Sequence, residues 1–92
     1  MLACHEQELT KVQDELEHSV KELRTNFAYD GAEHVSALEL AQEKWKAFAG
    51  AECDLLTYDS RGGTAYDLHV VECLTTRHAR RIAEIQELLD SP

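Results

Sequence analysis

Apolar residues recur every three or four positions in three separate stretches of this chain, a spacing typical of amphipathic α-helices. The first stretch contains Leu9, Val12, Leu16, Val20, Leu23 and Phe27. The second contains Val35, Leu38, Ala41, Trp45 and Phe48, and we expect it to reach Leu55 or Leu56. The third contains Leu68, Val71, Leu74, His78, Ile82, Ile85 and Leu89. Because no segment alternates apolar and polar residues, we expect no strands.

Two short polar stretches separate these helices. Residues 29–31 interrupt the first pattern and predict a turn, with Asp30 as the N-cap of the next helix. Residues 59–64 form the clearest loop, because the adjacent Gly62 and Gly63 are costly to hold in a helix. Gly50, inside the second stretch, predicts a bend or a close helix contact. We therefore expect helices at about 4–28, 31–57 and 65–90.

Short connections make consecutive helices antiparallel neighbours, so the predicted fold class is all-α, an up-down-up three-helix bundle. The chain has 92 residues, which is enough for a single small domain over residues 1–92. With 43% hydrophobic residues the composition is too apolar for a disordered chain. No stretch approaches the roughly 20 apolar residues of a membrane span, so we expect no transmembrane segment.

The chain is acidic, with 18 acidic and 9 basic side chains and a formal charge of −9. This charge argues against nucleic acid as a partner, since phosphate binding needs clustered Lys and Arg. Residues 1–60 hold 13 of the acidic side chains against 5 basic ones. A cationic partner would be steered towards that part of the molecule. The alternative is that these are ordinary solvated helix faces.

Three cysteines, Cys4, Cys53 and Cys73, are distant in sequence, but the predicted bundle brings them to one end. A disulfide requires Cα atoms within roughly 7 Å, and the preferred pair is Cys53 with Cys73, across the glycine loop. Such a bond contributes about 2–4 kcal/mol. Cys4 is then left unpaired or available for an intermolecular bond. The alternative is three reduced cysteines in a core.

Other candidate sites are weaker. Glu15 and His18 form one Glu-x-x-His motif, whereas di-metal bundles need two such motifs and further Glu ligands. The sequence shows no oxyanion donor near the cysteines. We therefore expect no metal, no cofactor, no catalytic residue and no enzymatic activity. Trp45 and Phe48 are expected in the core, and Arg81 is expected to form an ion pair with a neighbouring helix.

Several short motifs follow one another along the chain: an Ala-Gln-x-x-Trp run at 41–45, Ala-x-Cys at 51–53, Gly-Gly-Thr at 62–64, Cys-Leu at 73–74, and Arg81. Together they resemble the lysozyme-inhibitor LprI-type family of bacterial envelope proteins. The chain departs from the family pattern at Ala49 and Gly50, where the family has an Arg-Asp pair, and at Thr64, where it has Ser. The resemblance implies a helical, disulfide-stabilised, periplasmic or secreted domain. Before Cys4, residues 1–3 lack the charged and apolar regions of a signal peptide.

For some members the resemblance implies inhibition of lysozyme. A basic lysozyme with an acidic cleft would attract this acidic chain, and the loop after the second helix could then fill the cleft. The candidate loop residues are Tyr58, Asp59, Ser60, Arg61, Gly62, Gly63 and Thr64. In this hypothesis Arg61 approaches the catalytic carboxylates and Tyr58 stacks in a sugar subsite. The alternatives are a simple connecting loop and, for the whole protein, a structural or assembly bundle that forms a homodimer or binds a partner helix.

Overall fold

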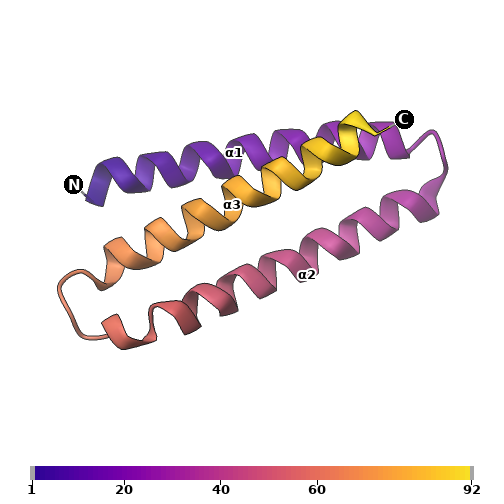
Figure 1. Ribbon diagram of the computed structural model, residues 1–92. Helices are drawn as coiled ribbons and strands as arrows, with labels where there is room; N and C mark the ends of the chain where they lie inside the picture. Colours follow the sequence, from indigo (N-terminus) through magenta and orange to yellow (C-terminus); the bar gives the residue numbers. More distant parts are fainter. Residues whose placement is uncertain (1, 92) are drawn as a thin grey trace.

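The computed structural model describes residues 2–91; Met1 and Pro92, the outermost residues of the expected domain, lie outside the described residues. Three helices follow one another, α1 (Leu2–Phe27), α2 (Ala32–Leu56) and α3 (Tyr66–Asp90), with a short 3₁₀ helix η1 (Tyr58–Ser60) after α2. They run up, down and up, and the predicted all-α three-helix bundle is confirmed (Figure 1). Among residues 2–91, none of the helices contains an apolar stretch that could span a bilayer.

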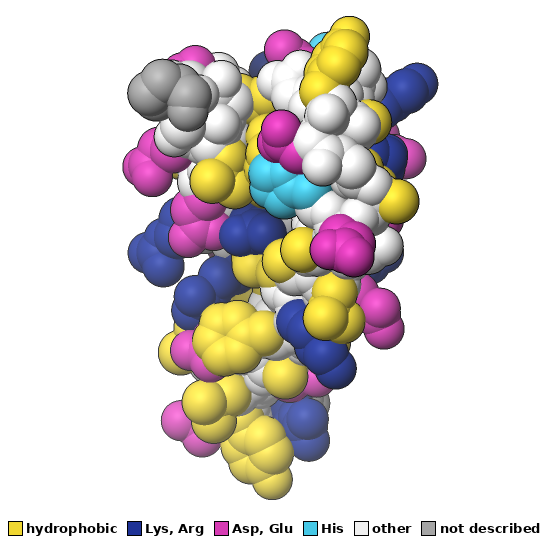
Figure 2. All heavy atoms as spheres, turned by 90° about the vertical axis from the view of Figure 1, so that its right-hand side faces the viewer, with side chains coloured by type: hydrophobic (Ala, Val, Ile, Leu, Met, Phe, Trp, Pro, Cys, Tyr) yellow, Lys and Arg dark blue, Asp and Glu magenta, His cyan; other side chains and the backbone are white. Residues whose placement is uncertain are grey.

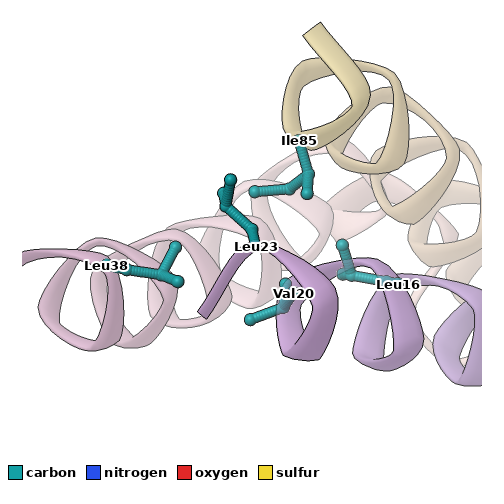
Figure 3. Packing of buried hydrophobic residues seen from close by; sticks show 5 residues of the cluster. All are labelled: Leu16, Val20, Leu23, Leu38 and Ile85. Atoms are coloured by element: carbon teal, nitrogen blue, oxygen red, sulfur yellow. The ribbon is translucent and has the colours of Figure 1, made fainter. Parts of the chain in front are cut away.

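The main hydrophobic cluster lies in the half of the bundle nearer the α1–α2 turn. It contains Leu16, Val20 and Leu23 of α1, Leu38 of α2 and Ile85 of α3. In Figure 3 the side chains of Leu23 and Ile85 point toward one another, and both are almost completely buried. The predicted stripe of α1 therefore faces the core from Val12 to Leu23, as its three-and-four spacing requires.

The helices are not packed evenly. α1 lies closely along α3, whereas α2 makes fewer contacts with either helix (Figure 1). The molecule is correspondingly elongated, measuring 49 × 23 × 17 Å. An open groove of about 760 Å³ runs between α1 and α2, with Trp45 and His78 among its lining residues. Arg24 and Glu39 form an ion pair between α1 and α2.

The predicted burial of Phe48 is wrong, because this side chain is 57% exposed. Its neighbour Ala49 is buried instead, together with Leu38 and Cys53. Successive helical residues are turned by about 100°. Since Cys53 must face α3 to bond Cys73, Ala49, one turn earlier, also faces inward and Phe48 faces outward. Three further residues of the expected stripe are also exposed, namely Ala41, Leu55 and Leu56.

The expected N-cap of α2 is also wrong. The N-cap is Gly31, at φ 117°, and no side chain caps the helix. Asp30 instead lies 3.0 Å from Nδ1 of His34, whose ring stacks on Phe27. The expected close helix contact at Gly50 is absent, because a Cβ there would meet nothing within 4 Å, and α2 continues through this residue.

His78 is a hydrogen-bonded core histidine, as its position on the third stripe predicts. Its side chain is buried, and its Nδ1 lies 2.7 Å from the carbonyl oxygen of Leu74. Since a carbonyl oxygen can only accept, Nδ1 donates this hydrogen bond. The ring of Trp45 meets the His78 ring edge-on and packs against the hydrophobic cluster. The aromatic pair therefore joins α2 to α3 midway along the bundle.

Candidate functional site

A disulfide between Cys53 and Cys73 joins the end of α2 to the beginning of α3, with the two Cα atoms 5.7 Å apart. This is the pair that the sequence favoured. Cys53 is almost completely buried, so the bond is part of the packed interior at this end of the bundle. By closing a loop of about 20 residues, it restricts the unfolded chain and stabilises the fold by about 3 kcal/mol.

Cys4 is a free cysteine on the exposed surface. It lies in the first turn of α1, at the end of the bundle where α2 and α3 are connected (Figure 1). All three cysteines therefore lie at one end of the molecule, as predicted, but only Cys53 and Cys73 are bonded to each other.

The segment that connects α2 to α3, residues 57–65, is called the diglycine loop here. It begins at Thr57, a buried residue whose N–H and hydroxyl both donate to the carbonyl oxygen of Cys53, at 3.0 and 2.7 Å. The 3₁₀ turn follows, in which the N–H of Ser60 donates to the carbonyl oxygen of Thr57 at 2.9 Å. The start of the loop is thus fixed one turn beyond the disulfide.

The two glycines have different roles in the loop. Gly62 has a φ of +80°, a conformation that other residues rarely adopt. Gly63 donates its N–H to the carbonyl oxygen of Ser60 at 3.0 Å, and a Cβ at this position would lie 3.1 Å from that same oxygen. Turn geometry therefore accounts for the Gly-Gly pair, as the simpler of the two interpretations predicted.

A side-chain contact ties the diglycine loop to α3. The Ser60 hydroxyl lies 2.7 Å from Nδ1 of His69, a hydrogen-bonding distance. This pair was not predicted from the sequence. The available signal was the short spacing of a hydroxyl and an imidazole on either side of a glycine turn.

The exposed part of the diglycine loop presents one aromatic ring and one cation. Tyr58 is 60% exposed, and the Arg61 guanidinium lies over its ring, 4.4 Å from the ring centroid. Such a cation–π contact keeps the guanidinium beside the ring while leaving its N–H groups free to bind a partner. We call Tyr58 and Arg61 the loop tip.

Beside the loop is an open pocket of about 380 Å³. Its lining residues are Leu56, Thr57, Ser60, His69, Glu72, Cys73, Thr76, Arg77 and Arg80. At its α2 side, Arg77 pairs with Glu52 across the two helices at 3.4 Å. Over residues 2–91 there is no group of three or more His, Cys, Asp or Glu side chains that could hold a metal ion.

Arg81 lies farther along α3 and has a different partner from the one expected. Its Nε donates to the side-chain oxygen of Gln42 on α2 at 2.7 Å, whereas its carboxylate partner, Glu84 at 3.0 Å, belongs to α3 itself. The guanidinium also lies 5.9 Å from the ring centroid of Trp45. Arg81 therefore connects α3 to α2 through a neutral amide and an aromatic ring, and the predicted ion pair between helices is wrong.

Comparisons with known proteins support the resemblance seen in the sequence. The family model described as lysozyme inhibitor LprI matches residues 1–85 of the chain. An uncharacterized protein of Rhizobium meliloti (strain 1021) is 36% identical over 64 residues, which are 70% of this chain and 45% of that protein. The chain thus spans less than half the length of this relative. No solved structure matches the chain significantly.

Proposed function

This chain belongs to the lysozyme inhibitor LprI family, and we propose that it is a non-catalytic binding module that inhibits a lysozyme. The family match over residues 1–85 is the observation that supports this function. The proposed partner is a basic lysozyme or another envelope protein. A periplasmic or secreted location is part of the proposal, and the disulfide is consistent with an oxidising compartment.

The charge of the chain supports attraction to such a partner. A formal charge of −9 on 92 residues produces a negative field that accelerates encounter with a cationic protein. Attraction of this kind acts before contact and does not fix the orientation of the complex. A specific inhibitor also needs a feature that fits the catalytic cleft.

We propose the loop tip as that feature. Glycosidases generally use a pair of carboxylates, and a guanidinium binds carboxylates by strong, geometrically defined hydrogen bonds. Arg61 is the basic side chain of the diglycine loop, and Tyr58 beside it offers an aromatic face of the kind that packs against a ligand. The disulfide, the Thr57 bonds and the Ser60–His69 contact hold the loop before binding. Less ordering entropy is then lost when the complex forms.

The test is the rate at which lysozymes of several classes lyse bacterial cell walls, measured with increasing amounts of the purified protein. We expect saturable inhibition of at least one basic lysozyme, and weaker inhibition as ionic strength rises, since salt screens the attraction. Replacing Arg61 by Ala should weaken inhibition at least tenfold. Lys11→Ala, which makes the same charge change at an exposed position on α1, is the matched control.

Two results would contradict different parts of the proposal. Unchanged lysis with every lysozyme class would contradict the inhibitory function. If Arg61→Ala and Tyr58→Ala both inhibit as well as the parent, the inhibitory function stands, but the loop tip is not the inhibitory site.

A further inference from the structure

Helix α2 has apolar residues on two sides. One side faces the bundle and includes the buried Leu38, Ala49 and Cys53. The other side is exposed to solvent, and we call it the outer face of α2. Its apolar residues, all exposed, are Ala37, Leu40, Ala47, Phe48, Ala51 and Leu55.

The outer face of α2 is a stripe along one side of the helix, interrupted by the charged Lys44. Leu40, Phe48 and Leu55 are 56%, 57% and 68% exposed, and small alanines lie between them. The stripe extends over about 27 Å, at 1.5 Å for each helical residue. Figure 2 shows hydrophobic side chains gathered over the lower part of the molecule, on the side where α2 lies in Figure 1. Exposed stripes of this kind mark interaction surfaces.

We propose that the outer face of α2 is the interface of a two-fold symmetric homodimer in which the two α2 helices pack antiparallel. A two-fold interface requires a surface that is complementary to itself. With the symmetry axis between Ala47 and Phe48, Leu40 lies opposite the partner's Leu55 at each end of the stripe. In the middle, the small side chain of Ala47 lies opposite the large ring of the partner's Phe48. Small and large residues that face one another in this way allow helices to pack closely.

The charges on this face favour a second copy in the antiparallel direction. Lys44 lies within the stripe and Asp54 at its edge; both are exposed, and neither forms an ion pair within residues 2–91. In the antiparallel arrangement, Lys44 lies within one turn of the partner's Asp54, and the symmetry axis repeats this pair. A parallel arrangement about the same stripe would place Lys44 beside the partner's Lys44, which is unfavourable.

This arrangement leaves the two diglycine loops at opposite ends of the interface, since the stripe ends at Leu55, before Tyr58. Dimerisation through α2 and inhibition through the loop tip are therefore separate properties. A variant that loses one of them can retain the other.

The test is sedimentation equilibrium of the full chain over a wide range of concentration. A Cys4→Ser background excludes an intermolecular disulfide at the free cysteine. We expect a reversible dimer that Phe48→Glu and Leu40→Glu each weaken at least tenfold, with the helical circular dichroism unchanged. Tyr29→Glu, at an exposed aromatic residue in the α1–α2 turn, is the matched control and should dimerise like the parent.

The direction of packing has its own test. Lys44→Glu and Asp54→Lys should each weaken the dimer, and the double variant should restore it. A chain that is monomeric at millimolar concentration would overturn the proposal, as would dimerisation that is insensitive to Phe48→Glu. Failure of the double variant to restore the dimer would overturn the antiparallel register. If the parent is monomeric and Phe48→Glu abolishes lysozyme inhibition, the outer face of α2 binds the lysozyme and not a second copy.

Discussion

The Ser60 hydroxyl lies 2.7 Å from Nδ1 of His69, so the diglycine loop is bound to the first turns of α3 by a side-chain contact as well as by the chain itself. His69 and Cys73 are four residues apart and therefore lie on the same side of α3. The disulfide of Cys73 attaches α3 to α2, and His69, one turn nearer the loop, contacts Ser60. The loop is thereby fixed at two successive turns of one helix.

Removing the Ser60–His69 contact should loosen the loop without unfolding the bundle. In Ser60→Ala we expect the free energy of unfolding to fall by no more than about 1 kcal/mol, because the contact is exposed. Hydrogen exchange at the N–H groups of Arg61 and Gly63 should become faster. Ser36→Ala, at an exposed position on α2, is the control. Exchange rates equal to those of the parent would show that the turn alone holds the loop.

Loss of the disulfide should destabilise the protein substantially. For Cys53→Ser combined with Cys73→Ser, we expect the free energy of unfolding to fall by about 2–4 kcal/mol, mainly because the unfolded chain is no longer restricted. Urea denaturation followed by circular dichroism measures this change. Cys4→Ser should have little effect, since Cys4 is free and exposed. Similar unfolding midpoints for both variants would contradict a stabilising role for the bond.

Phe48 is exposed and Ile85 is buried, so replacing each by alanine should affect stability very differently. Ile85 is completely buried, and Ile85→Ala should cost about 2–5 kcal/mol, because it removes apolar contacts and leaves a cavity. Phe48→Ala should change the stability of the monomer by no more than about 0.5 kcal/mol, as is usual for exposed positions. Both are measured by urea denaturation at a concentration where the chain is monomeric. A loss of several kcal/mol in Phe48→Ala would show that this ring is buried.

Two glycines should respond to alanine in opposite directions. At Gly62, with φ +80°, an alanine side chain strains the backbone, and we expect a loss of about 1–2 kcal/mol. Gly50 lies within α2, where a Cβ meets nothing within 4 Å, so Gly50→Ala should raise stability by up to about 1 kcal/mol. Thermal unfolding of the two variants shows the sign directly. Destabilisation by Gly50→Ala would indicate a contact that the structure lacks.

Much of the fold and part of the candidate site could be predicted from the sequence. The spacing of apolar residues in α1 matches its buried face at Val12, Leu16, Val20 and Leu23. The loop glycines predicted the turn at residues 59–64, and the hairpin geometry paired Cys53 with Cys73. These features depend on local sequence or on which segments a short loop brings together. Local information is therefore sufficient for them.

The sequence by itself determined three helices and their order, and it favoured the cysteine pair that the structure contains. Only the tertiary structure decided which side of α2 is buried, how Arg81 is bound and how Ser60 meets His69. The physical reason is that α2 is apolar on two sides, so the spacing of its residues fits two rotations of the helix about its axis. Contact with α3 through Cys53 and Ala49 selects one rotation, and Phe48 is turned to solvent as a result.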